Sequence, residues 1–310
     1  MSIYDVFNKG KKEENTDRQA WGNNFDKRAW SEQKQAQRKD AYELIDKTTE
    51  LIATNPQAFK QYLEVQSQFD RYTPTNAILV SAQMPEATQL KSYEDWKKKR
   101  VYLNPSAKDN KITILEPGKL YERQDGTTAT SFNAKIVYDV SHTTARIKTE
   151  DMEQKPIREL LTALIEASPV GFQPIDDLEV TAYYNDAQQT IYLRKDLSEV
   201  QLFNSMTLAV ASAIYELKHN EDPFRSEFKS YCVSYMLSHK YGVDTSAFSF
   251  EQLPPELAEL RQQEFRGDLN SMRDVLGEIH KEMYQHLEKD NFDKNNFDKN
   301  KSEKNRDQER

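Results

Sequence analysis

The sequence predicts an α+β fold in which helices come first, a small antiparallel sheet follows, and a mostly helical second unit completes the chain. Two observations lead to this prediction. Before residue 100 and again after residue 198, apolar residues recur at spacings of three and four, which is typical of one face of a helix. Between residues 111 and 140, short β-branched and aromatic runs alternate with turn residues, which is typical of strands. A length of 310 residues allows one or two domains.

The chain begins with a polar stretch and two predicted helices. Residues 1–30 are mixed in charge and have no apolar core of a secretory signal, so we expect a flexible N-terminus. Residues 31–54 carry apolar positions at helical spacing, and Asn55-Pro56 predicts the end of that helix. Residues 56–70 continue the same periodicity and predict a second helix.

Two shorter helices and a hairpin should follow. Pro74 suits the first turn of a helix that runs through Gln83, because the backbone there needs no N–H donor. Residues 92–99 predict one more helix. From 111 to 140 the apolar runs predict a small antiparallel sheet, and Asp125-Gly126 is a hairpin turn signal.

A polar connector, residues 141–155, precedes the second unit, which we place at residues 156–288. This unit should contain a helix, two strands, and several further helices. Ser198, with Gln201 three residues later, is a capping-box signature for the first long helix. Residues 289–310 repeat NFDKN and carry nearly equal numbers of acidic and basic residues, so we expect a charged, disordered tail.

The composition excludes several classes of function. The net charge is −8, so the chain has no global basic field, and any contact with nucleic acid must depend on a local patch. Cys232 is the single cysteine, so one chain can build neither a disulfide framework nor a cysteine-based zinc site. That usage fits a reducing compartment, and we expect a cytoplasmic protein. No stretch approaches ~20 consecutive apolar residues, so we expect no membrane span.

The segment from Arg71 to Arg100 combines aromatic, amide and cationic side chains, a mixture typical of surfaces that hold single-stranded nucleic acid. The candidate DNA contacts are Arg71, Tyr72, Thr73, Asn76, Gln83, Tyr93, Trp96, Lys97, Lys98, Lys99 and Arg100. Asn76 and Gln83 lie about two helical turns apart and should share a face. Residues 91–111 hold seven basic and three acidic residues, a local surplus of positive charge for phosphates.

Each of these residue types also has a purely structural interpretation. Trp96 is better interpreted as a core anchor than as a stacking platform, and Asn76 would equally cap or brace helices. A run of lysines is often a solvated helix face. Cys232 lies in an apolar stretch and predicts a small core residue rather than a nucleophile.

Several of these positions follow one pattern, YSxxNxLLxxxQxPxAT…W. The matching residues are Tyr72, Thr73, Asn76, Ile78, Leu79, Gln83, Pro85, Ala87, Thr88, Tyr93 and Trp96. With the DVSHT stretch at 139–143, they resemble the N-terminal domain of ArdC-type antirestriction proteins of conjugative plasmids and integrative elements. The loop at 103–110 departs from the family pattern. The resemblance implies a domain at residues 31–143 whose partner is single-stranded DNA.

The stretch DLSEVQLFNSMTLAVASAIYEL, at residues 196–217, resembles the active helix of the zincin-like peptidases found in the same family. There, two histidines four residues apart bind Zn²⁺ and a glutamate acts as general base. The corresponding positions here are Leu208, Ala209 and Ser212, and the third, acidic ligand corresponds to Lys229 or Tyr231. YGVDTSAFSF, at 241–250, continues the resemblance. None of these side chains can do the zinc chemistry, so we predict a degenerate, non-enzymatic peptidase-like unit with no metal and no cofactor.

The leading hypothesis is therefore a single-stranded-DNA-binding protein of a mobile element that protects or manages transferred DNA. Conjugation proteins or host restriction proteins are further candidate partners. A second hypothesis is an adaptor that binds other proteins and no DNA. A third is an enzyme with an unrecognised site built from His219, Asp222, Glu227 or His239, although the chain has no HxxxH or HxH pair.

Overall fold

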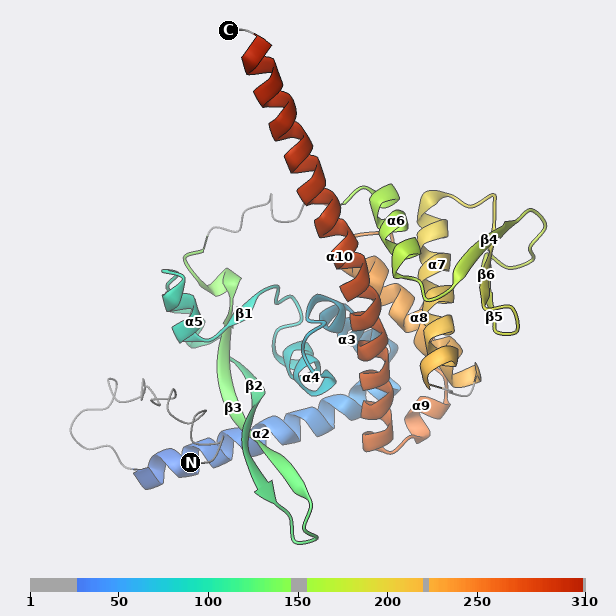
Figure 1. Cartoon of the computed structure of the whole chain (residues 1–310). Coiled ribbons are helices and arrows are strands. Elements are labelled where there is room, and N and C mark those ends of the chain that lie inside the picture. The colour runs from blue at the N-terminus through green and yellow to red at the C-terminus, as the bar shows by residue number, and fades with distance from the viewer. Residues whose placement is uncertain (1–26, 146–154, 220–222, 309–310) are drawn as a thin grey trace, which may run out of the picture.

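The computed structural model describes residues 27–145, 155–219 and 223–308, and it confirms the α+β class (Figure 1). Most of the expected flexible N-terminus lies outside the described residues. Its last four residues begin the first described helix. The N-terminal helices are α2 (Lys27–Thr54), α3 (Pro56–Gln68), α4 (Pro74–Gln83) and α5 (Tyr93–Lys98).

Local hydrogen bonds explain where these helices begin. Asn55 caps α3, because its side chain accepts a hydrogen bond from the backbone N–H of Ala58 at 2.9 Å. Thr73 caps α4 in the same way, and Pro74 occupies the first turn, as the sequence predicts. Ser92 caps α5 by accepting from the N–H of Asp95 at 3.2 Å.

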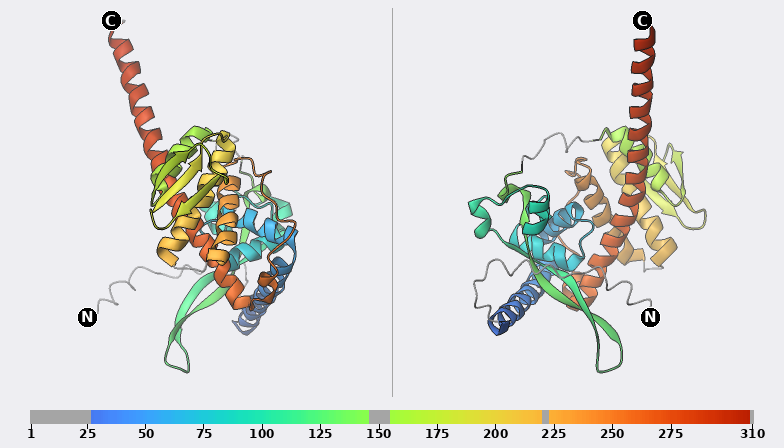
Figure 2. Two further views of the ribbon diagram at one scale, coloured as in Figure 1. Left: turned by 90° about the vertical axis from the view of Figure 1, so that its right-hand side faces the viewer. Right: turned by 60° about the vertical axis from the view of Figure 1, so that its left-hand side comes forward.

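The first sheet contains a short strand and a long hairpin. The strands are β1 (Leu90–Lys91), β2 (Ile112–Glu122) and β3 (Thr128–Asp139), in the antiparallel order β1-β3-β2. The pairing of β2 with β3 shifts register between Pro117 and Leu120. Gly118 lies inside this irregularity, and a Cβ there would come within 2.6 Å of the Ser131 Oγ, so only glycine fits without a shift. The hairpin tip projects from the body beside α2 (Figures 1 and 2).

The second half packs helices on one another beside a second small sheet. Its elements are α6 (Ile157–Ala167), β4 (Gly171–Ile175), β5 (Ala182–Asn185), β6 (Thr190–Arg194), α7 (Glu199–Ile214), a π-helical turn (Tyr215–His219), α8 (Pro223–Lys240), α9 (Glu256–Glu259) and α10 (Gln262–Gln308). The strand order is β4-β6-β5, with β4 parallel and β5 antiparallel to β6. The predicted capping box of Ser198 and Gln201 is present at the start of α7.

One hydrophobic core runs through both halves of the molecule. A single cluster of buried apolar side chains extends from α3 and α4 to α7, α8 and α10. The long helix α10 contacts α2 and α4 on one side and α6, α7 and α8 on the other (Figure 2). It also continues to Gln308, so the described helix includes most of the segment for which the sequence predicts a disordered tail. Cys232 is fully buried in this shared core.

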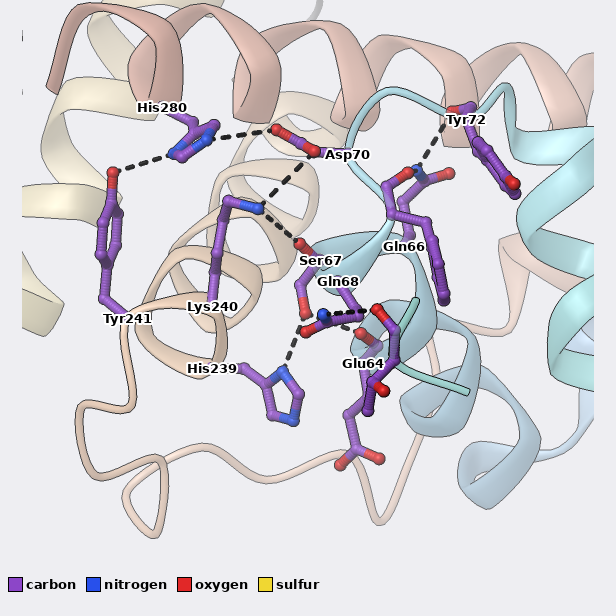
Figure 3. A network of polar contacts seen from close by, with 12 residues as sticks. Glu64, Gln66, Ser67, Gln68, Asp70, Tyr72, His239, Lys240, Tyr241 and His280 are labelled. Atoms are coloured by element: carbon purple, nitrogen blue, oxygen red, sulfur yellow. Dashed lines mark hydrogen bonds and ion pairs between the residues drawn. The ribbon is translucent and has the colours of Figure 1, made fainter. Parts of the chain in front are cut away.

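Polar contacts reinforce the junction of α3, α8 and α10 (Figure 3). The Lys240 ammonium lies 3.6 Å from the Asp70 carboxylate and donates to the Ser67 carbonyl at 3.1 Å. His280 contacts the other oxygen of Asp70 at 3.4 Å, and its Nδ1 lies 2.9 Å from the Tyr241 hydroxyl. Burial, together with the nearby Lys240 charge, lowers the pKa of His280 to about 4. The junction therefore holds a neutral imidazole at pH 7.

Candidate functional site

The two amides predicted to contact DNA are used to hold the sheet. Asn76 donates to the Leu115 carbonyl at 2.9 Å and accepts from the Leu115 N–H at 2.8 Å. Gln83 does the same to Thr113, with both distances at 2.9 Å. The two side chains share a face of α4, as expected, but that face meets the edge of β2. Each amide replaces the partner strand that this edge lacks, so both brace the fold and are not free to read bases.

Three further candidates also have structural roles. Trp96 is 2% exposed, its Nε1 donates to the Tyr138 carbonyl at 3.0 Å, and the Lys91 ammonium covers its ring at 4.5 Å. The structural interpretation of Trp96 therefore holds, because a buried ring cannot stack on a base. Thr73 caps α4. Tyr72 stacks on Phe69, with ring centroids 5.2 Å apart, and burial raises the pKa of its hydroxyl.

The remaining candidates lie on the surface, but at two different places. Tyr93, on α5, is 45% exposed, and the lysines at 97–99 and Arg100 follow it on the same short helix and its end. Lys98 pairs with Asp95 at 3.2 Å. We call Tyr93 and residues 97–100 the α5 cluster. Arg71 is exposed as well, but it lines a separate hollow with residues of α10.

A groove that the sequence analysis missed lies between α2 and the β2–β3 hairpin. It is a hollow of about 700 Å³. Its lining residues are Gln35, Arg38, Lys39, Tyr42, Lys119, Tyr121, Thr130, Ser131 and Phe132. A second hollow of about 370 Å³ continues it, because both are lined by Gln35 and Arg38. We call the two together the α2–hairpin groove.

The main hollow of this groove holds three cationic and three aromatic side chains and no carboxylate. The rings of Tyr42, Tyr121 and Phe132 are 41%, 51% and 37% exposed. Lys39 pairs with Glu43 at 3.6 Å, whereas Arg38 and Lys119 make no ion pair with any residue that the structure describes. In a protein of net charge −8, this is a local surface of positive charge with open aromatic faces.

One cation of β3, Lys135, relates the groove to the α5 cluster through its charge. The second hollow is bordered by Glu116, which pairs with Lys135 of β3 at 2.9 Å. The pKa of Asp95, on α5, is held low by its hydrogen bonds to Ser92 and Lys98, and the Lys135 charge adds to that shift. Lys135 thus lies within electrostatic reach of both surfaces.

A helical stripe in the sequence could have revealed one wall of the groove. Trp30, Lys34, Arg38 and Tyr42 are spaced by four, and all four line the groove from α2. The stripe alternates rings and cations on one face of a helix. The opposite wall comes from the hairpin, some 80 residues later in the chain, and no local pattern links the two.

The positions aligned with the peptidase site lie where α7 meets α8. Leu208 and Tyr231 line an apolar cavity of about 470 Å³. Ala209 is 2% exposed, and the Ser212 hydroxyl donates back to the Leu208 carbonyl at 3.1 Å. Tyr231 accepts from the Ser249 N–H at 2.7 Å. Ser212 is not among the residues that line the cavity.

A nearly buried ion pair is part of the lining of the same cavity. The Lys229 ammonium lies 3.6 Å from the Asp268 carboxylate, and the two side chains are only 5% and 14% exposed. The ammonium also lies 5.2 Å from the centre of the Tyr215 ring. Among the described residues, no group of three or more His, Cys, Asp or Glu side chains is arranged to hold a metal ion.

Comparison with known proteins finds a likeness in fold. The chain is similar to the metal-free crystal structure of the antirestriction protein ArdC from plasmid R388, with a TM-score of 0.48 and 12% identity, over 68% of this chain and 85% of that one. For the Mn(II)-bound structure of ArdC, the TM-score is 0.48 and the identity 13%, over 67% and 84% of the two chains. No family model and no curated protein sequence matches the chain.

The arrangement thus offers two hollows of opposite character. The α2–hairpin groove is polar and positive, and the cavity between α8 and α10 is apolar. No helix within the described ranges combines the length and the apolar character needed to cross a bilayer.

Proposed function

We propose that this protein binds single-stranded DNA in the α2–hairpin groove and that the α5 cluster extends the binding surface. The observation that carries the proposal is the lining of the main hollow, with three cations, three rings and no carboxylate. Phosphates would pair with Arg38, Lys39 and Lys119. Unpaired bases would stack on the exposed rings of Tyr121 and Phe132, since stacking on an aromatic side chain contributes roughly 1–3 kcal/mol per base.

The biological role that we propose is protection or management of DNA transferred between cells, as in antirestriction. It is supported by the sequence resemblance over residues 72–96 and 139–143, together with a groove suited to unpaired strands. Duplex DNA keeps its bases stacked inside the helix. It would therefore use the cations of the groove but not its rings, and should bind more weakly.

We further propose that the protein breaks no bond. The aligned positions Leu208 and Ala209 offer neither a metal ligand nor a general base, and the Tyr231 hydroxyl is engaged by Ser249. A metal analysis of the purified protein tests this part of the proposal. Stoichiometric zinc or manganese would contradict it.

The DNA proposal is tested by fluorescence anisotropy with a labelled 20-nucleotide single strand and the matching duplex, over a salt series. We expect tighter binding of the single strand and a linear fall of log affinity with log salt. The triple variant Arg38→Glu/Lys39→Glu/Lys119→Glu should bind at least a hundredfold more weakly, with a salt slope reduced by about 2, because single strands lose about 0.7 per phosphate contact.

The matched control is Arg158→Glu/Lys195→Glu/Lys281→Glu, which makes the same charge change on surface residues of the second half. It should lose far less affinity than the groove variant. Absence of binding at low salt, or an equal loss in both variants, would overturn the proposal. Absence of binding would favour a protein-binding adaptor instead.

A further inference from the structure

A separate feature is the apolar cavity that α8, the residues in and around α9, and α10 line together with Leu208 of α7. Phe228 and Tyr231 of α8 form one wall, and Leu260 and Phe265, next to and within α10, form another. Its volume of about 470 Å³ lies in the range of ligand pockets in proteins, and apolar atoms dominate its lining.

The walls are held in place by their own contacts. Tyr231 is fixed by its hydrogen bond with Ser249 at 2.7 Å, and its ring packs at a tilt of 59° against the rings of Phe248 and Phe250. The Lys229–Asp268 pair ties α8 to α10 across the cavity at 3.6 Å. A cavity that is formed before a ligand arrives loses less conformational entropy on binding.

Charge at the cavity is negative. Its lining contains three carboxylates, from Glu227, Glu256 and Asp268, and one ammonium, from Lys229. Lys229 is paired with Asp268, and both are nearly buried. Glu227 and Glu256 are exposed, and neither makes an ion pair with any residue that the structure describes. Two carboxylates therefore face solvent beside an apolar hollow.

We propose that this cavity docks a peptide segment of a partner protein, in which an apolar side chain enters the hollow and adjacent basic residues pair with Glu227 and Glu256. Protein interfaces commonly place one apolar or aromatic anchor in such a pocket. Opposite charges around the anchor add speed and specificity of association. The same carboxylates repel nucleic acid, so the cavity and the α2–hairpin groove would take different partners.

The test uses fluorescein-labelled hexapeptides and anisotropy with the full-length protein. The probe has a central Leu-Phe pair flanked by two lysines on each side. One comparison peptide replaces the lysines with glutamates, and another replaces Leu-Phe with Ser-Ser. We expect the first peptide to bind at least tenfold more tightly than either comparison peptide.

Two variants test whether the peptide binds at this cavity. Glu227→Lys/Glu256→Lys changes only exposed side chains and should weaken binding of the basic peptide at least tenfold. Leu260→Trp fills the hollow and should have a similar effect. The matched control is Glu166→Lys/Glu179→Lys, which reverses two other exposed carboxylates and should leave peptide binding within twofold.

Three results would overturn the proposal. They are no binding of the basic apolar peptide at millimolar concentration, equal binding of the acidic peptide, or unchanged binding in Glu227→Lys/Glu256→Lys. Affinity for the DNA single strand is measured on the same variants and should not fall. Peptide docking and DNA binding can therefore succeed or fail separately.

Discussion

The α2–hairpin groove and the cavity between α8 and α10 are hollows of opposite chemistry. The groove exposes cations and rings that have few partners, whereas the cavity is apolar and encloses one nearly buried ion pair. The first is built from a helix face and a projecting hairpin. The second opens at the surface beside the shared core, since partly buried side chains that pack against that core line it.

The difference shows that a binding site is identified by side chains whose polar groups and ring faces make no contacts within the fold. Asn76, Gln83 and Trp96 have the right chemistry for nucleic acid, but the fold already uses every polar group that would make the contact. Arg38, Lys119 and Tyr121 have ordinary chemistry, but the fold leaves them open. Side chains with unused donors and faces are the ones that can bind a partner.

The largest expected effect concerns the ion pair in the cavity. Lys229→Met removes a nearly buried ammonium that lies 3.6 Å from the Asp268 carboxylate, so we expect a loss of about 3 kcal/mol in the free energy of unfolding. Urea titration followed by circular dichroism measures it. Lys229→Met/Asp268→Leu should recover most of the loss. No difference between the single and double variants would contradict a structural role for the pair.

The second prediction separates a role of Asn76 in stabilising the sheet from a role in binding DNA. Asn76→Ala removes both hydrogen bonds to Leu115 and leaves a backbone N–H and C=O without partners, which should lower the free energy of unfolding by about 2–3 kcal/mol. Affinity of the folded variant for single-stranded DNA should not change. The control Gln35→Ala, at an exposed position in the groove, should alter stability by less than about 0.5 kcal/mol. A DNA affinity lost with stability intact would restore Asn76 as a contact.

Asn76 and Gln83 also show what the sequence could and could not predict. Helix spacing, proline and capping residues predicted α3, α4 and the start of α7, because those signals act within a few residues. The shared face of Asn76 and Gln83 followed from helical geometry alone. What that face meets depends on β2, some 30 to 40 residues later, and no local pattern encodes that distance.

Local sequence patterns likewise do not show how the two halves of the chain pack together. A polar connector predicted two units, and this division stays a prediction. What the sequence did not reveal is that α10 packs on helices of both halves and that one buried cluster extends through them. The groove needed residues of α2 and the hairpin together. The positions aligned with the peptidase site, in contrast, need no knowledge of the fold. Leu208 and Ala209 could be judged from side-chain chemistry alone, since no fold gives a leucine a metal-binding atom.

The third prediction is that stability depends on pH through His280, at the junction of α3, α8 and α10. The pKa of His280 is about 4 in the folded protein and 6.5 without burial. As pH falls below 6.5 the unfolded chain takes up a proton first, so stability is complete above 6.5 and is lost toward 4. At pH 5 the loss should be about 1–2 kcal/mol, allowing for partial solvent screening.

His280→Gln should flatten this dependence, because glutamine does not titrate and can still contact Tyr241 and Asp70. A remaining slope is expected from His239, whose pKa burial also lowers. Urea unfolding at pH 7, 6 and 5 makes the measurement. An identical slope in the wild type and the variant would exclude His280 as the cause.

The smallest effect concerns the α5 cluster, which the sequence favoured as the centre of DNA binding. Lys97→Glu/Lys98→Glu/Lys99→Glu should weaken single-strand binding only three- to fivefold, or about 0.5–1 kcal/mol. The reason is that these cations lie on an open helix without a hollow, and Lys98 is already paired with Asp95. Solvent and salt screen such charges strongly. If this variant instead lost more affinity than Arg38→Glu/Lys39→Glu/Lys119→Glu, the α5 cluster would be the primary site and the α2–hairpin groove its extension.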